Sequence, residues 1–343
     1  MKTKVAIIEL SNSHDECIYS QIKFLLSDGD YNITLICNET IHNRLIGNLV
    51  DVDIKLMEIR RDINMPLDIL RLRSYIVKSK FDKVIFNTAT GNIVKLLMLL
   101  PFPKQMEFLG IVHNIGKLEG SANQDIISRK VKKYFVLSEY LKENAPNKYN
   151  IEYFYPMFFP NSESVEVDKK EDEIWVCIPG QIERKRRDYD GLFELLANSK
   201  LNKNIKFILL GSGDTTYITS KIEKLGIKKQ FVWWEKFVGS PEFENYIEKS
   251  DYILPLIHTN HKSYSLYQNQ ITGTFNIAYG YGKTMLIEES LQDVTDFKGS
   301  VFYKTRELIG LLNSLKFSPV NPYIDKRWSF DKQKNRYLEF LEK

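Results

Sequence analysis

The sequence predicts an α/β protein made of two parallel-sheet domains in tandem. Short apolar runs alternate with longer helical patterns in both halves of the chain, and a polar segment separates the halves. The length of 343 residues also exceeds what one hydrophobic core usually serves. Because the strand-like runs are continuously apolar, we expect each sheet to be parallel and covered by helices on both faces.

The first half contains predicted strands with helical stretches between them. The predicted strands are Lys4–Leu10, Ile33–Cys37, Ile54–Ile59, Lys83–Asn87, Phe108–His113 and Tyr134–Leu137, and the helical stretches are Cys17–Ser27, Leu67–Ser79, Asn92–Leu100 and Ile126–Lys132. The charged segment Asn161–Glu173 then follows two prolines and is the best linker candidate. We therefore predict an N-terminal domain at residues 1–160.

The second half repeats this alternation. The predicted strands are Ile174–Ile178, Ile205–Leu210, Phe231–Trp234, Tyr252–Leu256, Met285–Ile287 and Val301–Tyr303, and the helices are Tyr189–Asn198, Ile218–Leu225, Glu242–Lys249, Thr274–Tyr279 and Arg306–Leu315. A last amphipathic stretch, Asp331–Glu342, has Tyr337, Leu338 and Leu341 on one face. We place a second domain at residues 174–325 and a terminal helical segment at 326–343.

The composition narrows the class of protein. The formal net charge is only +4, and no dense Lys/Arg tract interleaved with aromatic residues is present, so we expect no nucleic-acid partner. The three cysteines are scattered without a CxxC pair, which indicates neither a disulfide framework nor a zinc site. The N-terminus lacks the pattern of a signal peptide, and no apolar run approaches ~20 residues. These features predict a cytoplasmic protein.

One basic stretch leaves two interpretations open. Residues 60–80 hold six cations against two carboxylates, with leucines interleaved. A solvated helix face is the plain interpretation. The alternative is attraction to anionic lipid headgroups, which predicts peripheral association with the inner face of the plasma membrane.

Two segments of the second half suit a phosphate ligand, since open parallel sheets bind ligands beyond the carboxyl ends of their strands. Gly180 follows the first strand of this half and precedes four cations at residues 184–187. Fixed cations stabilise the charge that develops on a leaving diphosphate, although a solvated basic turn has the same composition. In the second segment, Thr272 can cap a helix while Gly273 leaves amides open to an anion; a plain N-cap is the alternative.

Other polar groups also follow strands. Ser13, His14 and Glu16 come after the first strand, and His113 and Asn114 come after another. Either histidine can bond a sugar hydroxyl or transfer a proton, or serve as a structural hydrogen-bonding group. The sequence Gly-Ser-Gly at residues 211–213 lacks the third glycine of a dinucleotide fingerprint, which counts against a nicotinamide enzyme.

Taken in order, these segments resemble the GT-B glycosyltransferases, in particular the large bacterial group called family 4 or glycosyl transferases group 1. The resemblance spans about Ile178 to Ile287, in the stretches IPGQIERKRRDYDGLFELL, IKFILLGSG, FVWWEKFVGSPEFENYIEKSDYILPLI and ITGTFNIAYGYGKTMLI. The segment with Trp328 resembles the final helix that packs back onto the first domain. The first half matches in pattern and in Val112–Asn114.

The resemblance implies an architecture and an activity. It implies GT-B architecture, with two Rossmann-like doubly wound domains facing across a cleft, an acceptor on the first and a nucleotide-sugar on the second. The implied enzyme is a retaining hexosyltransferase of bacterial surface polysaccharide synthesis, with a UDP- or GDP-sugar as co-substrate and a glycan or lipid-linked acceptor. Protein cations and helix amides then stabilise the diphosphate without a bound metal or cofactor.

The resemblance also implies roles for single residues. Arg184 and Lys185 fall at the family's diphosphate-binding cations, and Gln181 falls where a second arginine is usual. His113 matches the histidine beside the reacting sugar, with Ser13, His14, Glu16 and Asn114 on the acceptor side. The remaining donor-side residues are Gly180, where the backbone can approach the ligand, Asn269 and Gln270 near the sugar, Thr272, Gly273 and Thr274 in the phosphate loop, and Phe237 and Val238 near the base.

Two departures keep alternatives open. The family's paired glutamates would fall at Asn269 and Ile277, and a glycine pair is replaced by Ser-Asn-Ser at residues 11–13. The first departure leaves retention or inversion of configuration open. A nucleotide-sugar epimerase on the same fold is one alternative, and a non-catalytic scaffold or partner protein is another.

Overall fold

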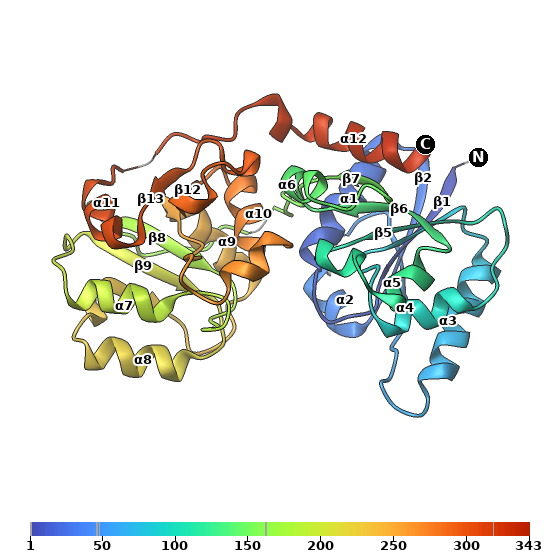
Figure 1. Ribbon diagram of the computed structural model, residues 1–343, viewed down its shortest axis with the longest axis horizontal. Coiled ribbons are helices and arrows are strands. Elements are labelled where there is room, and N and C mark those ends of the chain that lie inside the picture. The colour runs from blue at the N-terminus through green and yellow to red at the C-terminus, as the bar shows by residue number, and fades with distance from the viewer. Residues whose placement is uncertain (1, 46, 48, 162, 318) are drawn as a thin grey trace. The chain divides into compact units, whose positions relative to one another are not determined.

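The chain divides into two compact units, shown in Figure 1 from a computed structural model that describes residues 2–45, 47, 49–161, 163–317 and 319–343. Unit 1 comprises Met1–Pro160, Asn269–Ile271 and Ser329–Lys343, and unit 2 comprises Asn161–Gln268 and Thr272–Trp328. Ser162, inside the predicted linker, lies outside the described residues. The chain therefore passes into unit 1 at residue 269, returns to unit 2 at residue 272, and enters unit 1 again at residue 329.

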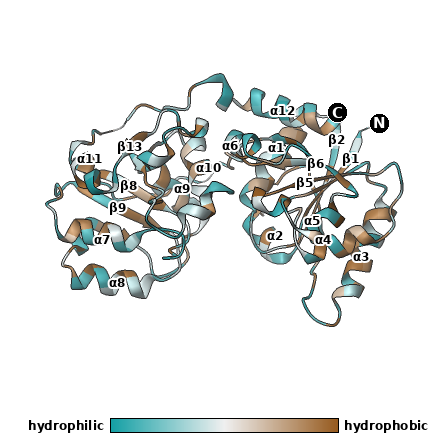
Figure 2. Cartoon of the chain, in the orientation of Figure 1, coloured by the Kyte–Doolittle hydropathy of each residue, from teal (hydrophilic) through white to brown (hydrophobic). Residues whose placement is uncertain are grey.

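The sheet of unit 1 has seven strands among the described residues, and all neighbouring strands are parallel. Its order is β3-β2-β1-β4-β5-β6-β7. The strands are β1 Thr3–Glu9, β2 Tyr31–Cys37, β3 Asp53–Leu56, β4 Lys83–Phe86, β5 Glu107–Ile111, β6 Val131–Val136 and β7 Asn150–Tyr153. The central strands β1, β4 and β5 are mostly apolar, as Figure 2 shows, which suits strands that helices cover on both faces.

Helices connect these strands. They are α1 Glu16–Asp28, α2 Glu39–Leu45, α3 Met65–Ser79, α4 Asn92–Leu99, α5 Ala122–Ile127 and α6 Glu139–Glu143, with a 3-10 helix at Ile115–Leu118. Helix α1 ends at Gly29, whose left-handed conformation lets its N–H bond to the carbonyl of Leu26. Its buried face carries Phe24 and Leu25 into the unit's core.

The last helix, α12 Phe330–Glu342, belongs to unit 1. Its buried residues Gln333, Tyr337, Phe340 and Leu341 recur at helical spacing. The Tyr337 ring stacks on Phe135 at 4.6 Å between centroids, with 9° between the planes. Helix α12 therefore completes a core of aromatic side chains under the sheet.

Unit 2 has a six-stranded parallel sheet among its described residues, in the order β10-β9-β8-β11-β12-β13. The strands are β8 Ile174–Pro179, β9 Ile205–Leu210, β10 Phe231–Trp233, β11 Tyr252–Ile253, β12 Thr284–Glu288 and β13 Val301–Tyr303. The helices are α7 Tyr189–Ala197, α8 Thr215–Lys224, α9 Ser240–Lys249, α10 Gly273–Gly280 and α11 Leu308–Ser314.

The predicted fold class is confirmed, because both halves are α/β with wholly parallel sheets. The structure adds elements that the sequence analysis did not predict, namely β7, α2 and α6. These elements have four, seven and five residues, too few for a hydrophobic period to stand out.

Candidate functional site

The two segments of unit 2 that were predicted to bind phosphate, at Gly180 and at Thr272–Gly273, lie against each other. Thr274, in the first turn of α10, donates its hydroxyl to the carbonyl of Pro179 at the end of β8, at 3.2 Å. The same hydroxyl accepts a hydrogen bond from Nη2 of Arg187 at 2.9 Å. The loop after β8 and the N-terminus of α10 therefore meet at one place in the unit.

Arg187 is the cation that the structure brings to this place. Arg187 is only 5% exposed, and its Nη1 is buried without a hydrogen-bond partner among the described residues. Its Nη2 lies 3.1 Å from the position that a Cβ on residue 180 would take. Gly180 has a φ of 96°, a backbone conformation that favours glycine. The absence of a side chain at Gly180 also leaves room for the Arg187 guanidinium beside it. No carboxylate pairs with Arg187 within the described part of the chain.

The predicted cations of this loop lie elsewhere on its surface. Arg184 forms a salt bridge with Asp190 at 2.7 Å, and its guanidinium lies 3.9 Å from the centroid of the Tyr217 ring. Hydrogen bonding to Asp190 raises the pKa of Arg184. Lys185 is exposed, and no hydrogen bond or ion pair of its ammonium is found among the described residues. Gln181 is exposed as well.

A buried hydrogen-bonded chain fixes the backbone next to Arg187. Asp188 caps α7 by accepting a hydrogen bond from the Gly191 amide, and its other oxygen lies 2.7 Å from Nδ1 of His258. The second nitrogen of His258 lies 3.0 Å from the hydroxyl of Tyr303. Burial alone raises the pKa of Asp188, but the bonds from His258 and Gly191 outweigh it, and the net pKa is lowered. Asp188 is thus held as a carboxylate, which fixes where the Arg187 side chain starts.

The N-terminus of α10 presents an open amide beside this cation. Thr272 is the N-cap, and its hydroxyl accepts the N–H of Thr274 at 3.4 Å. Gly273 is exposed, and a Cβ built on it would meet no atom within 4 Å. Its N–H has no partner among the described residues. A helix N-terminus and a buried guanidinium together favour an anion.

The glycines after β9 serve the packing of two loops. A Cβ on Gly211 would lie 2.1 Å from the carbonyl oxygen of Gly180. A Cβ on Gly213 would lie 2.3 Å from the carbonyl oxygen of Ile182. Backbone hydrogen bonds join the same loops, with the Ile182 amide donating to the Ser212 carbonyl at 2.8 Å. These glycines allow the β9 loop to support the Gly180 loop from behind.

The predicted base-binding residues lie in the loop between β10 and α9. Phe237 is 75% exposed, whereas Val238 is buried. The next residue, Gly239, is the N-cap of α9. The Phe237 side chain is thus available to a ligand.

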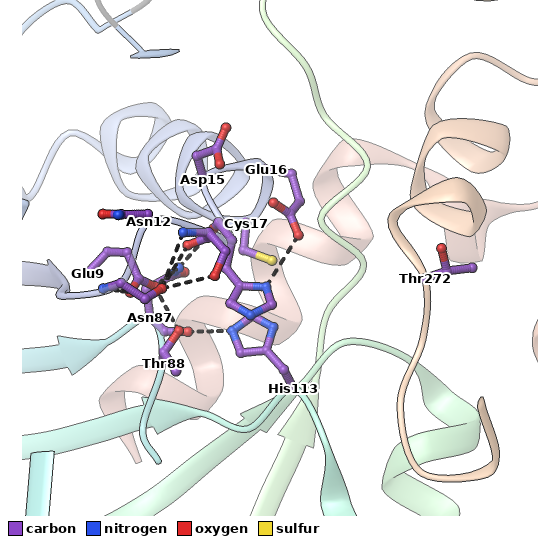
Figure 3. Close-up of polar contacts among 12 residues, drawn as sticks. Glu9, Asn12, Asp15, Glu16, Cys17, Asn87, Thr88, His113 and Thr272 are labelled. Carbon is purple, nitrogen blue, oxygen red and sulfur yellow. Dashed lines mark hydrogen bonds and ion pairs between the residues drawn. The ribbon is translucent and has the colours of Figure 1, made fainter. Parts of the chain in front are cut away.

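In unit 1, a buried carboxylate organises the loop after β1 (Figure 3). Glu9 is fully buried and accepts hydrogen bonds of 2.7 Å from the Ser11 amide, the Asn87 carboxamide and the Thr88 hydroxyl. The Asn87 carboxamide also donates to the carbonyl of His14 at 2.9 Å. The ends of β1 and β4 are thereby tied together.

Two histidines stack beside this network. The rings of His14 and His113 have centroids 3.7 Å apart and an interplanar angle of 21°. Nε2 of His113 lies 2.7 Å from the carbonyl oxygen of Asn87, so this nitrogen carries the proton. Nδ1 of a neutral His113 is then an acceptor, and it has no partner among the described residues. His14 has a φ of 71°, and its Nδ1 lies 3.6 Å from a carboxylate oxygen of Glu16.

The pKa values of the two imidazoles are shifted in opposite directions. Burial, followed by the charge of His14, lowers the pKa of His113 to about 3, so His113 is neutral at pH 7. Burial also lowers the pKa of His14, but the Glu16 carboxylate outweighs it and the net pKa is raised. The same pairing lowers the pKa of Glu16. An imidazole whose pKa is raised by its carboxylate thus lies against a neutral ring whose free nitrogen accepts hydrogen bonds.

Further predicted residues meet at the end of β5. The Asn114 carboxamide donates to Oε1 of Gln270 at 3.1 Å, and the Ile115 amide donates to the Asn269 carbonyl at 2.8 Å. Asn269 and Gln270 thus belong to unit 1, whereas Thr272 and the rest of α10 belong to unit 2. The structure separates residues that the sequence analysis had grouped into one donor loop. Ser13 is exposed and lies 3.1 Å from Ser11, hydroxyl to hydroxyl.

A cavity of about 370 Å³ adjoins Glu9 in unit 1. Its lining combines polar residues such as Ser11 and Thr88 with apolar residues such as Met65 and Val94. Among the described residues, no group of three or more His, Cys, Asp or Glu side chains is arranged to hold a metal ion. None of the described helices combines the length and the apolar character needed to span a bilayer.

The fold of the chain is that of the GT-B glycosyltransferases. Anabaena Alr3699/HepE in complex with UDP-glucose superposes with a TM-score of 0.68 at 11% identity, over 99% of each chain. The lipopolysaccharide outer core galactosyltransferase WaaB gives 0.61 at 12% identity, over 99% of each chain. The UDP-GlcNAc 2-epimerase from Methanocaldococcus jannaschii gives 0.58 at 12% identity, over 100% of this chain and 99% of the other.

These likenesses rest on structure alone. No protein-family model matches the chain, and no curated protein sequence matches it. At such low identity the superpositions establish the fold.

The sequence analysis passed over three residues that the structure brings forward. Arg187 stood in the predicted basic run but was not singled out, and Asp188 and His258 were not considered. One available signal was the position of Arg187 directly before the residue that caps α7.

Proposed function

We propose that this protein transfers a sugar from a nucleotide-sugar to a hydroxyl group of an acceptor. The single observation that carries the proposal is Arg187, a buried guanidinium without a carboxylate partner beside the open N-terminus of α10. Burying a charge without a counter-ion is costly, so this site favours a bound anion. A diphosphate supplies the anion and is the leaving group of nucleotide-sugars.

In the proposed reaction, the acceptor oxygen forms a bond to the anomeric carbon while the bond from that carbon to the diphosphate oxygen breaks. The proton of the acceptor hydroxyl passes to an oxygen of the departing diphosphate. Arg187 and the Gly273 amide stabilise the negative charge that develops on the departing diphosphate. Lys185, exposed and unpaired among the described residues, is proposed to add a further cation to the phosphates. In this proposal the protein groups provide the stabilisation and no metal ion takes part.

His113 is proposed to orient the substrate. Its pKa of about 3 makes it a weak base at pH 7, so proton abstraction from a hydroxyl is disfavoured. Its free Nδ1 instead suits a hydrogen bond from a sugar hydroxyl. The finer features of the proposal are a UDP- or GDP-sugar donor, a glycan or lipid-linked acceptor, and a role in bacterial surface polysaccharide synthesis.

A nucleotide-binding experiment tests the proposal. Titration calorimetry of the Arg187→Gln variant with UDP and GDP should show affinity about 10- to 100-fold weaker, because a charge-assisted bond contributes ~1.5–3 kcal/mol. Arg186→Gln is the matched control, since Arg186 is exposed and paired with Glu183 at 3.0 Å. Thermal unfolding verifies that Arg187→Gln is folded. Wild-type affinity in a folded Arg187→Gln variant would contradict the proposal.

A second candidate function is epimerisation of a nucleotide-sugar, favoured by the likeness to the M. jannaschii 2-epimerase. Both reactions use the same anion site. Incubating the protein with UDP-GlcNAc in the absence of an acceptor separates them, because only an epimerase converts the intact donor into its epimer. If no nucleotide or nucleotide-sugar raises the melting temperature, both enzymatic functions fail, and the scaffold alternative is favoured.

A further inference from the structure

The edge strand β3 of unit 1 combines exposed apolar side chains with an open backbone edge. It is the last strand of its sheet and pairs on one side with β2. Ile54 and Leu56 share one face of the strand and are 37% and 48% exposed. Val50, just before the strand, is 70% exposed. An edge of this kind is a template for a further strand unless it is protected.

The backbone hydrogen bonds show which groups of β3 face the open edge. The Met57 amide donates to the carbonyl of Cys37 in β2 at 2.8 Å. Because the N–H and C=O groups of successive strand residues point to opposite sides, those of Lys55 also face β2. Those of Ile54 and Leu56 therefore point away from β2. Within the described part of the chain β3 has no second neighbour, so these groups are open to a further strand.

Two charges of opposite sign occupy the other face of β3. Asp53 and Lys55 are two residues apart, and neither forms an ion pair among the described residues. The Lys55 ammonium lies 5.3 Å from the centroid of the Tyr75 ring. A single charge on an edge strand discourages pairing with another chain. Adjacent charges of opposite sign instead favour a partner strand that carries the same pattern in the reverse direction.

One antiparallel register makes β3 complementary to itself. With a two-fold axis through Ile54, Asp53 of each copy lies opposite Lys55 of the other, and Leu56 lies opposite Val52. Since the backbone groups of Ile54 face the open edge, the two copies of this residue exchange N–H···O=C bonds. The charged pairs then take the non-hydrogen-bonded positions, where side chains lie closer. Apolar pairs and charged pairs fall on opposite faces, and each pair is favourable.

We propose that β3 pairs antiparallel with β3 of a second copy of this chain, so that the two unit 1 sheets become continuous. The inference rests on the edge and the charge pattern of β3 and is independent of sugar transfer. A second copy is favoured over another protein because the pattern is complementary to itself, as a two-fold contact requires. Strands this short bury less than the ~800 Å² a stable partner uses, so we expect a dissociation constant on the order of 10–100 µM.

Charge reversal across the proposed pair tests the inference. Sedimentation velocity of the full-length wild type should show a dimer that forms with rising concentration between about 1 and 300 µM. Asp53→Lys places lysines opposite each other, and Lys55→Asp does the same with aspartates, so each variant should self-associate at least about tenfold more weakly. An equal mixture of the two variants should form a heterodimer about as strongly as wild type dimerises, because every lysine then meets an aspartate.

The double variant Asp53→Lys/Lys55→Asp provides a second arm. It restores opposite charges in the same register and should dimerise like wild type. Lys104→Asp is the matched control, since Lys104 is exposed in the loop before β5, and it should leave the dimer unchanged. Thermal melting verifies that each variant is folded. A wild type that stays monomeric throughout this range would overturn the inference. Single variants that dimerise like wild type would also overturn it, and so would a mixture and a double variant that remain monomeric.

Discussion

Replacing Tyr337 with phenylalanine removes one hydroxyl from the interior of unit 1. That hydroxyl donates to Oε1 of Gln21 at 3.1 Å, and both residues are fully buried. The Gln21 amide in turn donates to Oδ1 of Asn87 at 2.8 Å, and the Asn87 carbonyl holds His113. A hydrogen-bonded chain thus runs from α12 to the stacked histidines.

The size of the effect follows from what the substitution leaves behind. The phenylalanine ring keeps the stack on Phe135, so no large cavity forms. Oε1 of Gln21 is left buried without a donor, which costs ~1–3 kcal/mol in the free energy of unfolding. Tyr31→Phe is the matched control, because Tyr31 donates to Glu342, whose side chain is half-exposed and can bond to water instead. We expect the control to lose at most ~1 kcal/mol.

The assay uses the distribution of tryptophans. All four, Trp175, Trp233, Trp234 and Trp328, lie in unit 2, so their fluorescence reports that unit while circular dichroism reports both. In urea, Tyr337→Phe should lower the midpoint of the circular dichroism transition that belongs to unit 1, without a change in m. A midpoint equal to that of Tyr31→Phe would refute the reasoning that the buried chain supports α12.

Two further predictions concern the sites themselves. The pKa of His113 is about 3 in the folded protein and near 6.5 in the unfolded chain, so the unfolded chain takes up the proton first as pH falls. The free energy of unfolding of wild type should therefore decrease from pH 6.5 toward 3, and His113→Phe should lack this component of the decrease. Urea midpoints with the same pH dependence in both proteins would contradict the assignment. Gly211→Ala should lower the free energy of unfolding by at least ~2 kcal/mol, because its Cβ would lie 2.1 Å from the Gly180 carbonyl oxygen. Gly310 lies inside α11, and a Cβ there would meet no atom within 4 Å, so Gly310→Ala should be neutral or stabilising by up to ~1 kcal/mol in the same urea denaturation experiment.

The predictable part of the fold is the part that leaves a local pattern. The strand predicted at Ile205–Leu210 matches β9, because six apolar-rich residues between turns have few other interpretations. The five-residue helix α6 was missed, since it contributes one buried side chain, Leu141. The parallel arrangement followed from strands that are apolar on both faces.

The candidate site was less predictable, because the burial of each side chain determines which of the candidate residues lie at the site. Four consecutive cations look equivalent in the sequence, yet Asp190 and Tyr217 hold Arg184 at the surface while Arg187 turns inward to Thr274. Likewise Gln270 and Thr272 are two residues apart but belong to different units, because Asn114 pairs with Gln270 across a long sequence separation. Contacts of this kind leave no periodic signal.

The place of α12 in the chain has a consequence for synthesis. The ribosome synthesises all strands of unit 1 and then all strands of unit 2 before it synthesises α12, the helix that covers Phe24 and Phe135. The aromatic underside of the nascent first half therefore stays uncovered while the second half is translated. Premature termination before residue 330 leaves it permanently open, and such fragments should be substrates for chaperones and proteases rather than partly active products.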